Sequence, residues 1–351
     1  MFKRRTLFVL GAGASKELKL PTGNELAFTI SQKMNVSLNA YRRGQTDAPS
    51  DLDLFAEFAR SSQEDMTAYE KAFWLIRDGV LTQNSIDDFL DIHKDNPRAQ
   101  RVGKAAIIKQ ILLAERNSHL YFDTSNAYNK MKMVKLENTW LLKFMRMLGR
   151  GVSLKDIEYL FEEIAFIVFN YDRCLEHFLI QALKSAYDLS ETEATGLMLK
   201  LRIIHPYGVA GTLKTPSAPN GVAYGGGPEP HERHIPLIDQ IKTYTEQVDD
   251  PDELQAIWDL VVRADQIVFL GFAFHDQNVQ LLRPKEKLKA KKIFGTTFGM
   301  SDSDVEIIQG QLLQFFEDSQ MRIMRDMNRI VLRSDLTCSG LFDQYTKSLP
   351  G

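Results

Sequence analysis

Short runs of mainly apolar residues alternate with helical patterns along most of this 351-residue chain. A continuous apolar run is typical of a strand buried on both faces of a parallel sheet. Such runs predict strands at residues 7–10, 164–169, 202–204, 267–270, 293–296 and 330–332. Amphipathic or capped segments predict helices at residues 24–33, 174–183, 254–262, 278–282, 301–316 and 341–347. This alternation predicts an α/β fold with a doubly wound, Rossmann-like parallel sheet.

The stretch from about residue 50 to residue 160 shows a different pattern. Its apolar residues recur at helical spacing among charged residues, and it holds few candidates for strands. We therefore divide the chain into a first part of the Rossmann-like domain at residues 1–49, a helical insertion at residues 50–160 and the rest of the domain at residues 161–351. Within the last part, residues 208–236 are rich in glycine and proline. They predict a long loop, which acts as a lid, binds a ligand or is disordered.

The composition excludes several classes of protein. With 44% hydrophobic residues, 25% charged residues and a net charge of −3, the chain resembles an ordinary soluble protein and is not a polyanion binder as a whole. Its two cysteines, Cys174 and Cys338, cannot form a four-cysteine zinc site and fit a reducing compartment. The apolar run after Lys3-Arg4-Arg5 is too short for a signal peptide, and no run approaches the length of a membrane span. We expect a cytoplasmic protein.

The first predicted strand ends in a turn of small residues, Gly11, Ala12, Gly13, Ala14 and Ser15. Glycine has no Cβ, so the backbone can turn tightly there and approach another group closely. A helix that starts in this turn would offer free N–H groups and a positive dipole end to a phosphate. The turn thus suggests a pyrophosphate cradle, although Lys16 replaces the third glycine of the dinucleotide fingerprint. An ordinary strand-to-helix turn is the alternative.

Polar residues follow three other predicted strands. Asn170 and Asp172 follow the strand at 164–169, and His205 follows the strand at 202–204. After the strand at 267–270 comes Gly271-Phe272, with the polar residues Asp276 and Asn278 close behind. Ligands of a doubly wound sheet bind beyond the carboxyl ends of the strands, so these segments should line one crevice. His205 suits proton transfer near neutral pH, and its alternative is a partly buried structural histidine. The alternative for Asp172 is the N-cap of the next helix.

Four further motifs have a structural interpretation that outweighs the functional one. The pair Asp87-Asp88 fits the first turn of a helix capped by Ser85, and Cys174 near His177 fits a helix core. His231 and His234 lack the spacing of the H-E-x-x-H zinc motif, and no metal site is predicted. The basic run at residues 283–292 fits a solvated connector, with nucleic-acid contact as the alternative.

Four segments, taken in chain order, resemble the motifs of the sirtuin-like superfamily, and in particular those of the bacterial sirtuin-like NAD hydrolases of antiphage defence. They are Gly11-Ala12-Gly13-Ala14-Ser15, Asn170-Tyr171-Asp172, His205-Pro206-Tyr207-Gly208 and Gly271-Phe272-Ala273-Phe274-His275-Asp276. The resemblance covers about residues 5–30 and 160–335.

This resemblance implies an NAD site. Asn170 would contact the nicotinamide ribose or position a water, His205 would be the catalytic base, and Asp172 would hold the nicotinamide side. The turn would hold the pyrophosphate, and the Gly271 segment would line its ribose and pyrophosphate end. The residues implied to bind NAD are Gly11, Ala12, Gly13, Ala14, Ser15, Thr22, Asn170, Asp172, Gly271 and Phe272.

Departures from the deacylases of this superfamily favour reaction with water. The zinc-binding cysteines are missing, Pro206-Tyr207 separates the histidine from its glycine, and Leu18–Gly23 replaces the Gly-Ile-Pro-Asp-Phe-Arg segment. We therefore expect an NAD hydrolase that releases ADP-ribose and nicotinamide as a regulated defence effector. We also expect a homo-oligomer built through the helical region, a regulatory protein partner, and nucleic acid contacts only indirectly. The alternatives are an NAD-dependent deacylase and a sensor of NAD or ADP-ribose that has no turnover.

Overall fold

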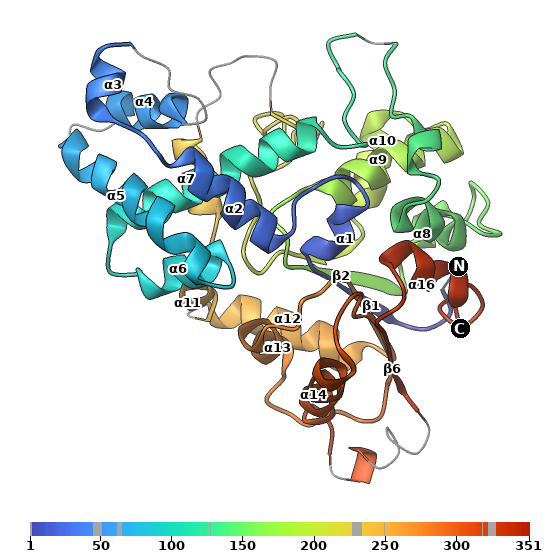
Figure 1. Ribbon diagram of the computed structural model, residues 1–351. Coiled ribbons are helices and arrows are strands. Elements are labelled where there is room, and N and C mark those ends of the chain that lie inside the picture. Colours follow the sequence, from blue (N-terminus) through green and yellow to red (C-terminus); the bar gives the residue numbers. More distant parts are fainter. Residues whose placement is uncertain are drawn as a thin grey trace.

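A six-stranded parallel sheet forms the centre of the molecule (Figure 1). The computed structural model describes residues 2–44, 51–61, 65–126, 128–226, 234–248, 250–317, 319–321 and 328–351. The strands are β1 (Thr6–Leu10), β2 (Ile164–Val168), β3 (Arg202–Ile204), β4 (Gln266–Leu270), β5 (Lys292–Thr296) and β6 (Ile330–Arg333). Their order, β3-β2-β1-β4-β5-β6, is that of dinucleotide-binding Rossmann folds. The predicted α/β fold with a parallel sheet is confirmed.

Helices cover both faces of the sheet, and this explains why β1 and β4 are buried along their whole length. On one face, Leu7 and Val9 of β1 share an apolar core with α2 (Gly23–Lys33), α4 (Leu52–Ser61), α5 (Met66–Gly79), α6 (Ile86–Ile92), α7 (Pro97–Arg116), α12 (Pro251–Arg263), α13 (Asp276–Leu282) and α14 (Asp302–Leu313). On the other face, Phe8 and Leu10 share a second core with α8 (Trp140–Leu148), α9 (Cys174–Tyr187), α10 (Glu191–Met198) and α16 (Cys338–Gln344). Shorter helices are α1 (Ala12–Lys16), α3 (Leu38–Arg42) and α11 (Tyr244–Val248).

The helical region between β1 and β2 contributes to both cores. Helices α4 to α7 pack on one face of the sheet, whereas α8 packs on the other beside α16 (Figure 1). Short 3₁₀ helices occur at Val80–Thr82, Met133–Leu136, Ile157–Tyr159 and Ile235–Gln240. The residues described between 51 and 160 contain no strand. The region is thus helical, and its apolar residues belong to the same two cores as the sheet. None of the described helices has the length and apolar character needed to cross a membrane.

Several predicted boundaries are wrong by a few residues. Helix α2 is capped by Thr22 instead of Asn24, because Thr22 and Glu25 form a capping box. Helix α14 ends at Leu313 instead of Phe316, because the following turn tightens and the backbone of Phe315 pairs with Leu288. Helix α16 begins at Cys338 instead of residue 341, because Thr337 accepts a hydrogen bond from the N–H of Gly340. The loop is predicted to reach residue 236, but a 3₁₀ helix already begins at Ile235.

The turn after β1 lies directly against the backbone at the end of β4. The N–H groups of Gly11 and Gly13 donate to the carbonyls of Leu270 and Gly271 at 3.0 Å. A Cβ on Gly11 would lie 2.5 Å from the oxygen of Gly271, and one on Gly271 would lie 2.0 Å from the nitrogen of Ala14. Gly271 also has a φ of +54°, which disfavours any side chain. The three glycines thus allow two strand ends to touch.

We predict that Gly271→Ala destabilises the fold by about 3 kcal/mol, since both the left-handed backbone and the collision with Ala14 oppose a methyl group. Gly310→Ala is the matched control, because Gly310 lies in α14 with nothing near its virtual Cβ. The control should gain up to about 1 kcal/mol from helix propensity. Urea denaturation of both variants checks this, and equal midpoints would contradict the close contact.

Candidate functional site

One cavity opens at the carboxyl ends of β1, β2 and β4, where the sequence predicts convergence. Its volume is about 140 Å³. It lies at the crevice between β1 and β4, the position at which the strand order of this sheet reverses. The residues that line it include Gly11, Ala12, Pro21, Thr22, Gly23, Ser85, Ile86, Asp87, Asp88, Phe169, Asn170, Tyr171, Asp172, Tyr207, Phe272, Ala273, His275 and Asn278.

The predicted site residues fall into two groups around this cavity. Those that line it are Gly11, Ala12, Thr22, Asn170, Asp172 and Phe272. Those that do not are Gly13, Ala14, Ser15, His205 and Gly271. Gly13 and Ala14 lie in the turn that packs against Gly271. Ser15 is hydrogen-bonded to Asp172, and His205 lies next to the carbonyl of Asn170.

Asn170, Asp172 and Ser15 form a buried hydrogen-bond network that joins β1 to β2. The hydroxyl of Ser15 donates to Oδ2 of Asp172 at 2.8 Å, and Nδ2 of Asn170 donates to Oγ of Ser15 and to the carbonyl of Gly11 at 3.1 Å. Oδ1 of Asp172 accepts from the N–H of Cys174, the first residue of α9, but the N-cap position is Arg173, one residue later than the capping interpretation of Asp172 expects. Asp172 thereby joins the turn after β1 to the first N–H of α9.

The Oδ1 atom of Asn170 is the exception in this network. It is buried and has no hydrogen-bond partner within the described part of the chain. Buried polar atoms are almost always hydrogen-bonded, to a ligand or water where the protein offers no donor. Because Asn170 lines the cavity, a small movement of its side chain would expose this buried acceptor to a hydroxyl group or an ordered water there.

The backbone donors of the glycine turn are engaged within the protein. The N–H groups of Gly11 and Gly13 donate to the end of β4, and that of Ala14 donates to the carbonyl of Gly11. The helix that follows, α1, has only five residues. The glycines of this turn therefore serve the contact between strand ends, and these three N–H groups do not point at a pyrophosphate in this conformation.

His205 lies behind Asn170 and faces α9. Its Nε2 is 2.7 Å from Oε1 of Glu176, and its Nδ1 is 3.3 Å from the carbonyl oxygen of Asn170. Burial lowers the pKa of His205, but the charge of Glu176 and the hydrogen bonds outweigh this and raise the pKa above its usual value. In this geometry His205 is the partner of Glu176 and supports the backbone of Asn170.

Asp87, for which the sequence favours a place in a helix turn over a role as a functional carboxylate, lines the cavity. Ser85 caps α6 by accepting a hydrogen bond from the N–H of Asp88, as expected. This cap directs Asp87 into the cavity, where it accepts a hydrogen bond from the hydroxyl of Tyr171. Burial raises the pKa of Asp87 to about 6; the Tyr171 hydrogen bond opposes this rise and the charge of Asp88 adds to it.

Aromatic side chains form the apolar wall of the cavity. The ring of Phe169 packs on Phe272 with centroids 5.0 Å apart and on Tyr207 at 5.8 Å. The Tyr207 hydroxyl donates to Oδ1 of Asn278 at 2.5 Å. A wall of this kind suits a flat ring and limits the entry of water.

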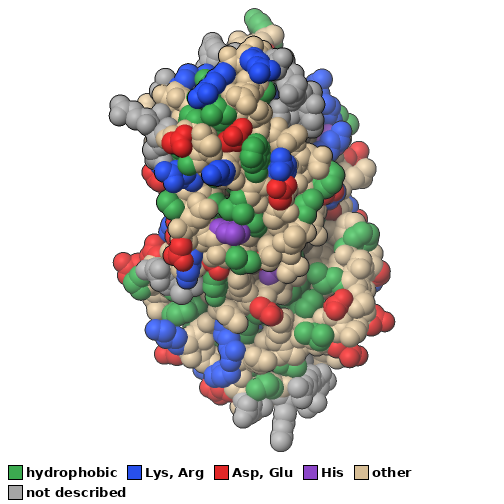
Figure 2. Space-filling model, turned by 60° about the vertical axis from the view of Figure 1, so that its left-hand side comes forward, with side chains coloured by type: hydrophobic (Ala, Val, Ile, Leu, Met, Phe, Trp, Pro, Cys, Tyr) green, Lys and Arg blue, Asp and Glu red, His purple; other side chains and the backbone are tan. Residues whose placement is uncertain are grey.

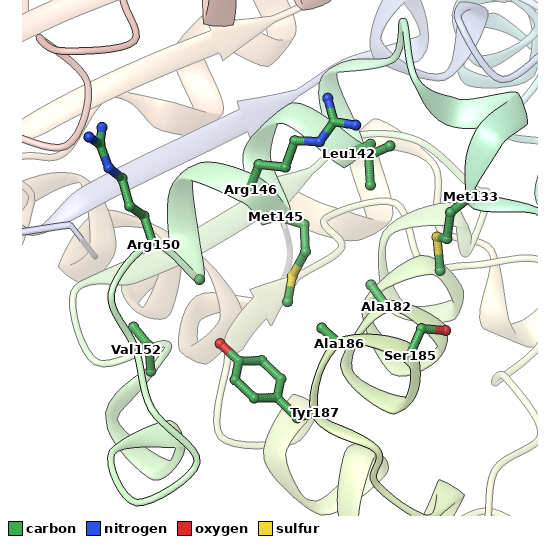
Figure 3. Close-up of a pocket in the computed structure, with 11 residues that line it drawn as sticks. Met133, Leu142, Met145, Arg146, Arg150, Val152, Ala182, Ser185, Ala186 and Tyr187 are labelled. Carbon is green, nitrogen blue, oxygen red and sulfur yellow. The ribbon is translucent and has the colours of Figure 1, made fainter.

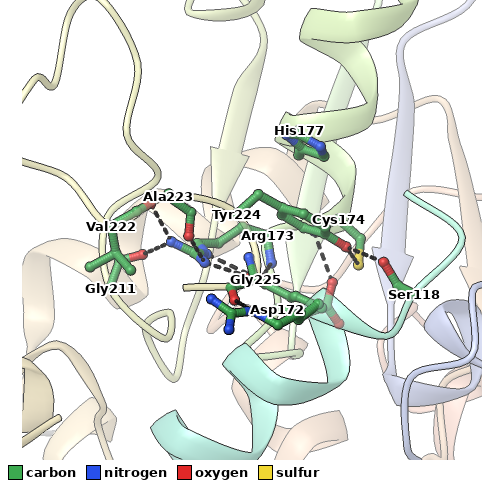
Figure 4. Close-up of polar contacts among 12 residues, drawn as sticks. Ser118, Asp172, Arg173, Cys174, His177, Gly211, Val222, Ala223, Tyr224 and Gly225 are labelled. Atoms are coloured by element: carbon green, nitrogen blue, oxygen red, sulfur yellow. Dashed lines mark hydrogen bonds and ion pairs between the residues drawn. The ribbon is translucent and has the colours of Figure 1, made fainter. Parts of the chain in front are cut away.

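A buried ion pair lies next to Asp172, one of the residues that line the cavity (Figure 4). Arg173, the residue after Asp172, bonds both carboxylate oxygens of Glu115 at the end of α7, with side chains only 1% and 0% exposed. The same guanidinium donates to the carbonyls of Gly211, Val222 and Ala223, while Glu115 accepts from the N–H of Gly225. This ion pair therefore orders the long loop after β3, whose residues 208–226 lack helices and strands as predicted.

Cys174 and His177 belong to the core, as the sequence indicated. Sγ of Cys174 lies 3.1 Å from the hydroxyl of Tyr224, and the His177 ring stacks on Tyr224 with centroids 4.0 Å apart. Burial lowers the pKa of His177 to about 3. His231 lies outside the described residues, whereas His234 is paired with Glu57 at 3.0 Å. The described residues hold no group of three or more metal ligands.

A larger hollow of about 530 Å³ lies away from the site, between α8 and α9 (Figure 3). Its floor is apolar, with Met145, Ala182 and Ala186, and two arginine side chains extend near its rim. None of the predicted site residues lines it. The chemistry thus gathers in the smaller cavity at the strand ends.

We predict that Arg173→Met lowers the free energy of unfolding by about 3–5 kcal/mol, because it leaves the charge of Glu115 buried and unpaired. Lys184→Met is the control, since its ion pair with Glu191 is largely exposed and should contribute less than about 1 kcal/mol. Combining Arg173→Met with Glu115→Met should restore part of the loss. Chemical denaturation measures all three, and equal effects of Arg173→Met and Lys184→Met would contradict this role.

We also predict that Asp87→Asn stabilises the protein at pH 7 by about 2 kcal/mol. The raised pKa means that the folded protein binds this proton more tightly than the unfolded chain does. Stability therefore falls as the pH rises from about 4 to 6, and the asparagine removes this loss. Thermal melts at pH 7 should show the gain and melts at pH 4 should not. Asp95→Asn, at an exposed carboxylate, is the control, and a destabilised Asp87→Asn at pH 7 would refute the prediction.

Comparison with known proteins does not assign a family. No family model matches this chain, and a search of curated proteins finds no significant match. A function for this chain therefore depends on the geometry of the cavity and on the motifs around it.

Proposed function

We propose that this chain is an NAD hydrolase that cleaves the nicotinamide–ribose bond and releases ADP-ribose and nicotinamide. The observation that carries the proposal is the unpartnered Oδ1 of Asn170, in a cavity at the β1–β4 crevice of a sheet with dinucleotide-binding strand order. The resemblance of the four strand-end segments to sirtuin-like NAD hydrolases supports the choice of substrate.

The proposed reaction needs little from the protein beyond position and charge. Nicotinamide leaves as a neutral group, so no acid is needed for its departure, and the transition state resembles an oxocarbenium ion. Asn170 would orient a ribose hydroxyl or the attacking water through Oδ1, while Phe169 and Phe272 keep the site dry. The carboxylates of Asp87 and Asp172 lie in the same lining and would stabilise the positive charge.

Two residues are candidates for the base that accepts the proton of water. The resemblance assigns this role to His205, which is engaged with Glu176 and does not line the cavity. Asp87 lines the cavity, and its pKa of about 6 suits a base near neutral pH. His205→Gln and Asp87→Asn distinguish them, because glutamine keeps a hydrogen bond to Glu176 but accepts no proton.

The size of the cavity favours a regulated enzyme. About 140 Å³ is less than the roughly 300–1,000 Å³ of pockets that enclose a whole small ligand. A dinucleotide would need α6 to move away from Tyr171, which Asp87 now contacts. Such a movement is a reasonable point of control for a defence effector, through oligomerisation of the helical region or through a partner protein.

We predict that the purified protein converts NAD to nicotinamide and ADP-ribose, separated by chromatography, and that Asn170→Ala lowers kcat at least about a hundredfold. Asn39→Ala, at an exposed position in α3, is the control and should keep full activity. If activity needs a trigger, the assay is repeated with candidate activators. Full activity of Asn170→Ala at unchanged stability would refute the site assignment.

A binding module for NAD or ADP-ribose is the second candidate, favoured by the engagement of His205 with Glu176. Calorimetry would then detect binding while chromatography finds the NAD intact. The deacylase alternative predicts that an acetyl-lysine peptide changes the products.

A further inference from the structure

A third concave surface lies at the amino ends of the strands, on the edge of the sheet opposite the candidate site. Its volume is about 1,130 Å³, the largest of the three hollows described in this article. Five chain segments line it: Arg4–Arg5 before β1, Val262–Asp265 before β4, Glu286–Lys292 with Phe294 before and in β5, Asn328–Arg329 with Val331 of β6, and Tyr345 after α16. We call this surface the basic groove.

The charge of the basic groove is strongly one-sided. Eight lysine and arginine side chains line it, against the two carboxylates of Asp265 and Glu286. The whole chain carries a net charge of −3, so the rest of the molecule is more acidic than the total suggests. On the face drawn in Figure 2, basic and acidic side chains are interspersed. The concentration of positive charge is thus a local property of the groove.

Some of these cations are used within the protein. The side chain of Arg5 donates two hydrogen bonds to Asp265, and Nζ of the buried Lys291 donates to the carbonyls of Val262 and Ala264. These contacts join β1, α12 and β5 and so shape the groove. Burial lowers the pKa of Lys291 to about 8, because it disfavours the charged form of the side chain.

Other cations of the groove remain available to a ligand. Arg4, Arg263 and Lys289 are exposed, and no ion pair or hydrogen bond of their side chains occurs among the described residues. Lys287 is exposed as well and makes one hydrogen bond, to the carbonyl of Gln314. The four come from three separate segments, so their charges spread along the groove and do not converge on one point. An extended chain of anions matches this spread better than a single phosphate does.

Aromatic rings add a second feature of the same surface. Tyr345 lines the groove and is partly exposed, with its ring 4.9 Å from that of Phe294. The ammonium of Lys292 lies over the Phe294 ring at 4.8 Å. Positive side chains along a concave surface, together with an accessible aromatic ring on which a base can stack, are the elements of single-strand nucleic acid binding.

We propose that the basic groove binds the phosphate backbone of a single-stranded nucleic acid. The site would act at the edge of the sheet remote from the candidate NAD cavity, so one ligand would not block the other. It also gives the basic run at residues 283–292 a role beyond that of a connector. The proposal does not depend on the proposed NAD hydrolysis.

Fluorescence anisotropy with a labelled single-stranded oligonucleotide of about 20 nucleotides tests the proposal. The wild-type chain should bind at roughly 50 mM salt, with an affinity that falls steeply toward 200 mM. The double variant Lys287→Glu with Lys289→Glu should bind at least about tenfold more weakly, with a salt slope smaller by about 1.4. The matched control is Lys130→Glu with Lys132→Glu, the same charge change at the same spacing on another exposed surface.

Each outcome supports or overturns the proposal. Binding that the groove variant loses and the control keeps supports it. It is overturned if the wild-type chain does not bind at low salt, or if both double variants weaken binding equally. It is also overturned if a duplex, an acidic peptide or a vesicle containing phosphatidylserine binds this groove and the single strand does not. Equal melting temperatures of the two variants exclude misfolding as the cause.

Discussion

The buried pair of Arg173 and Glu115 is the interaction on which the rest of the site depends. Each charge loses its hydration on burial, and such a pair is tolerated only when further hydrogen bonds satisfy both groups. Here the guanidinium is shielded from solvent and donates to a carboxylate and to three carbonyls of a loop that has no secondary structure of its own. Three parts of the chain that are distant in sequence are thereby joined: the end of α7, the start of α9 and the loop at residues 208–226.

The helical region is a structural part of the candidate site. It supplies Glu115 to the ion pair and Asp87 to the cavity, and its helices share both apolar cores with the sheet. A region that looks like an insertion along the chain thus packs as part of the same domain as the sheet. The contact between Asp87 of α6 and Tyr171 after β2 joins the helical region to the sheet within the lining of the cavity. Any movement of α6 therefore changes the cavity directly.

The sequence predicted the sheet well and the site less well, for a physical reason. Parallel strands buried on both faces are continuous apolar runs, so all six strands were recognised, and topology alone places their carboxyl ends together. The direction of a side chain depends on partners far along the chain. The pairing of Glu176 with His205, and that of Asp87 with Tyr171 from 84 positions away, could not be identified from local pattern. The cap of α2 could have been, because Glu25 follows Thr22 at the spacing of a capping box.

The contact between Gly11, Gly13 and Gly271 has a consequence for how such motifs are used. These glycines are required because two backbones touch, whether or not a nucleotide is bound. A related chain that binds no nucleotide would still need all three, since any side chain there would separate β1 from β4. The small-residue turn therefore reports on the fold, whereas the amide oxygen of Asn170, which has no partner among the described residues, is the better guide to a bound ligand.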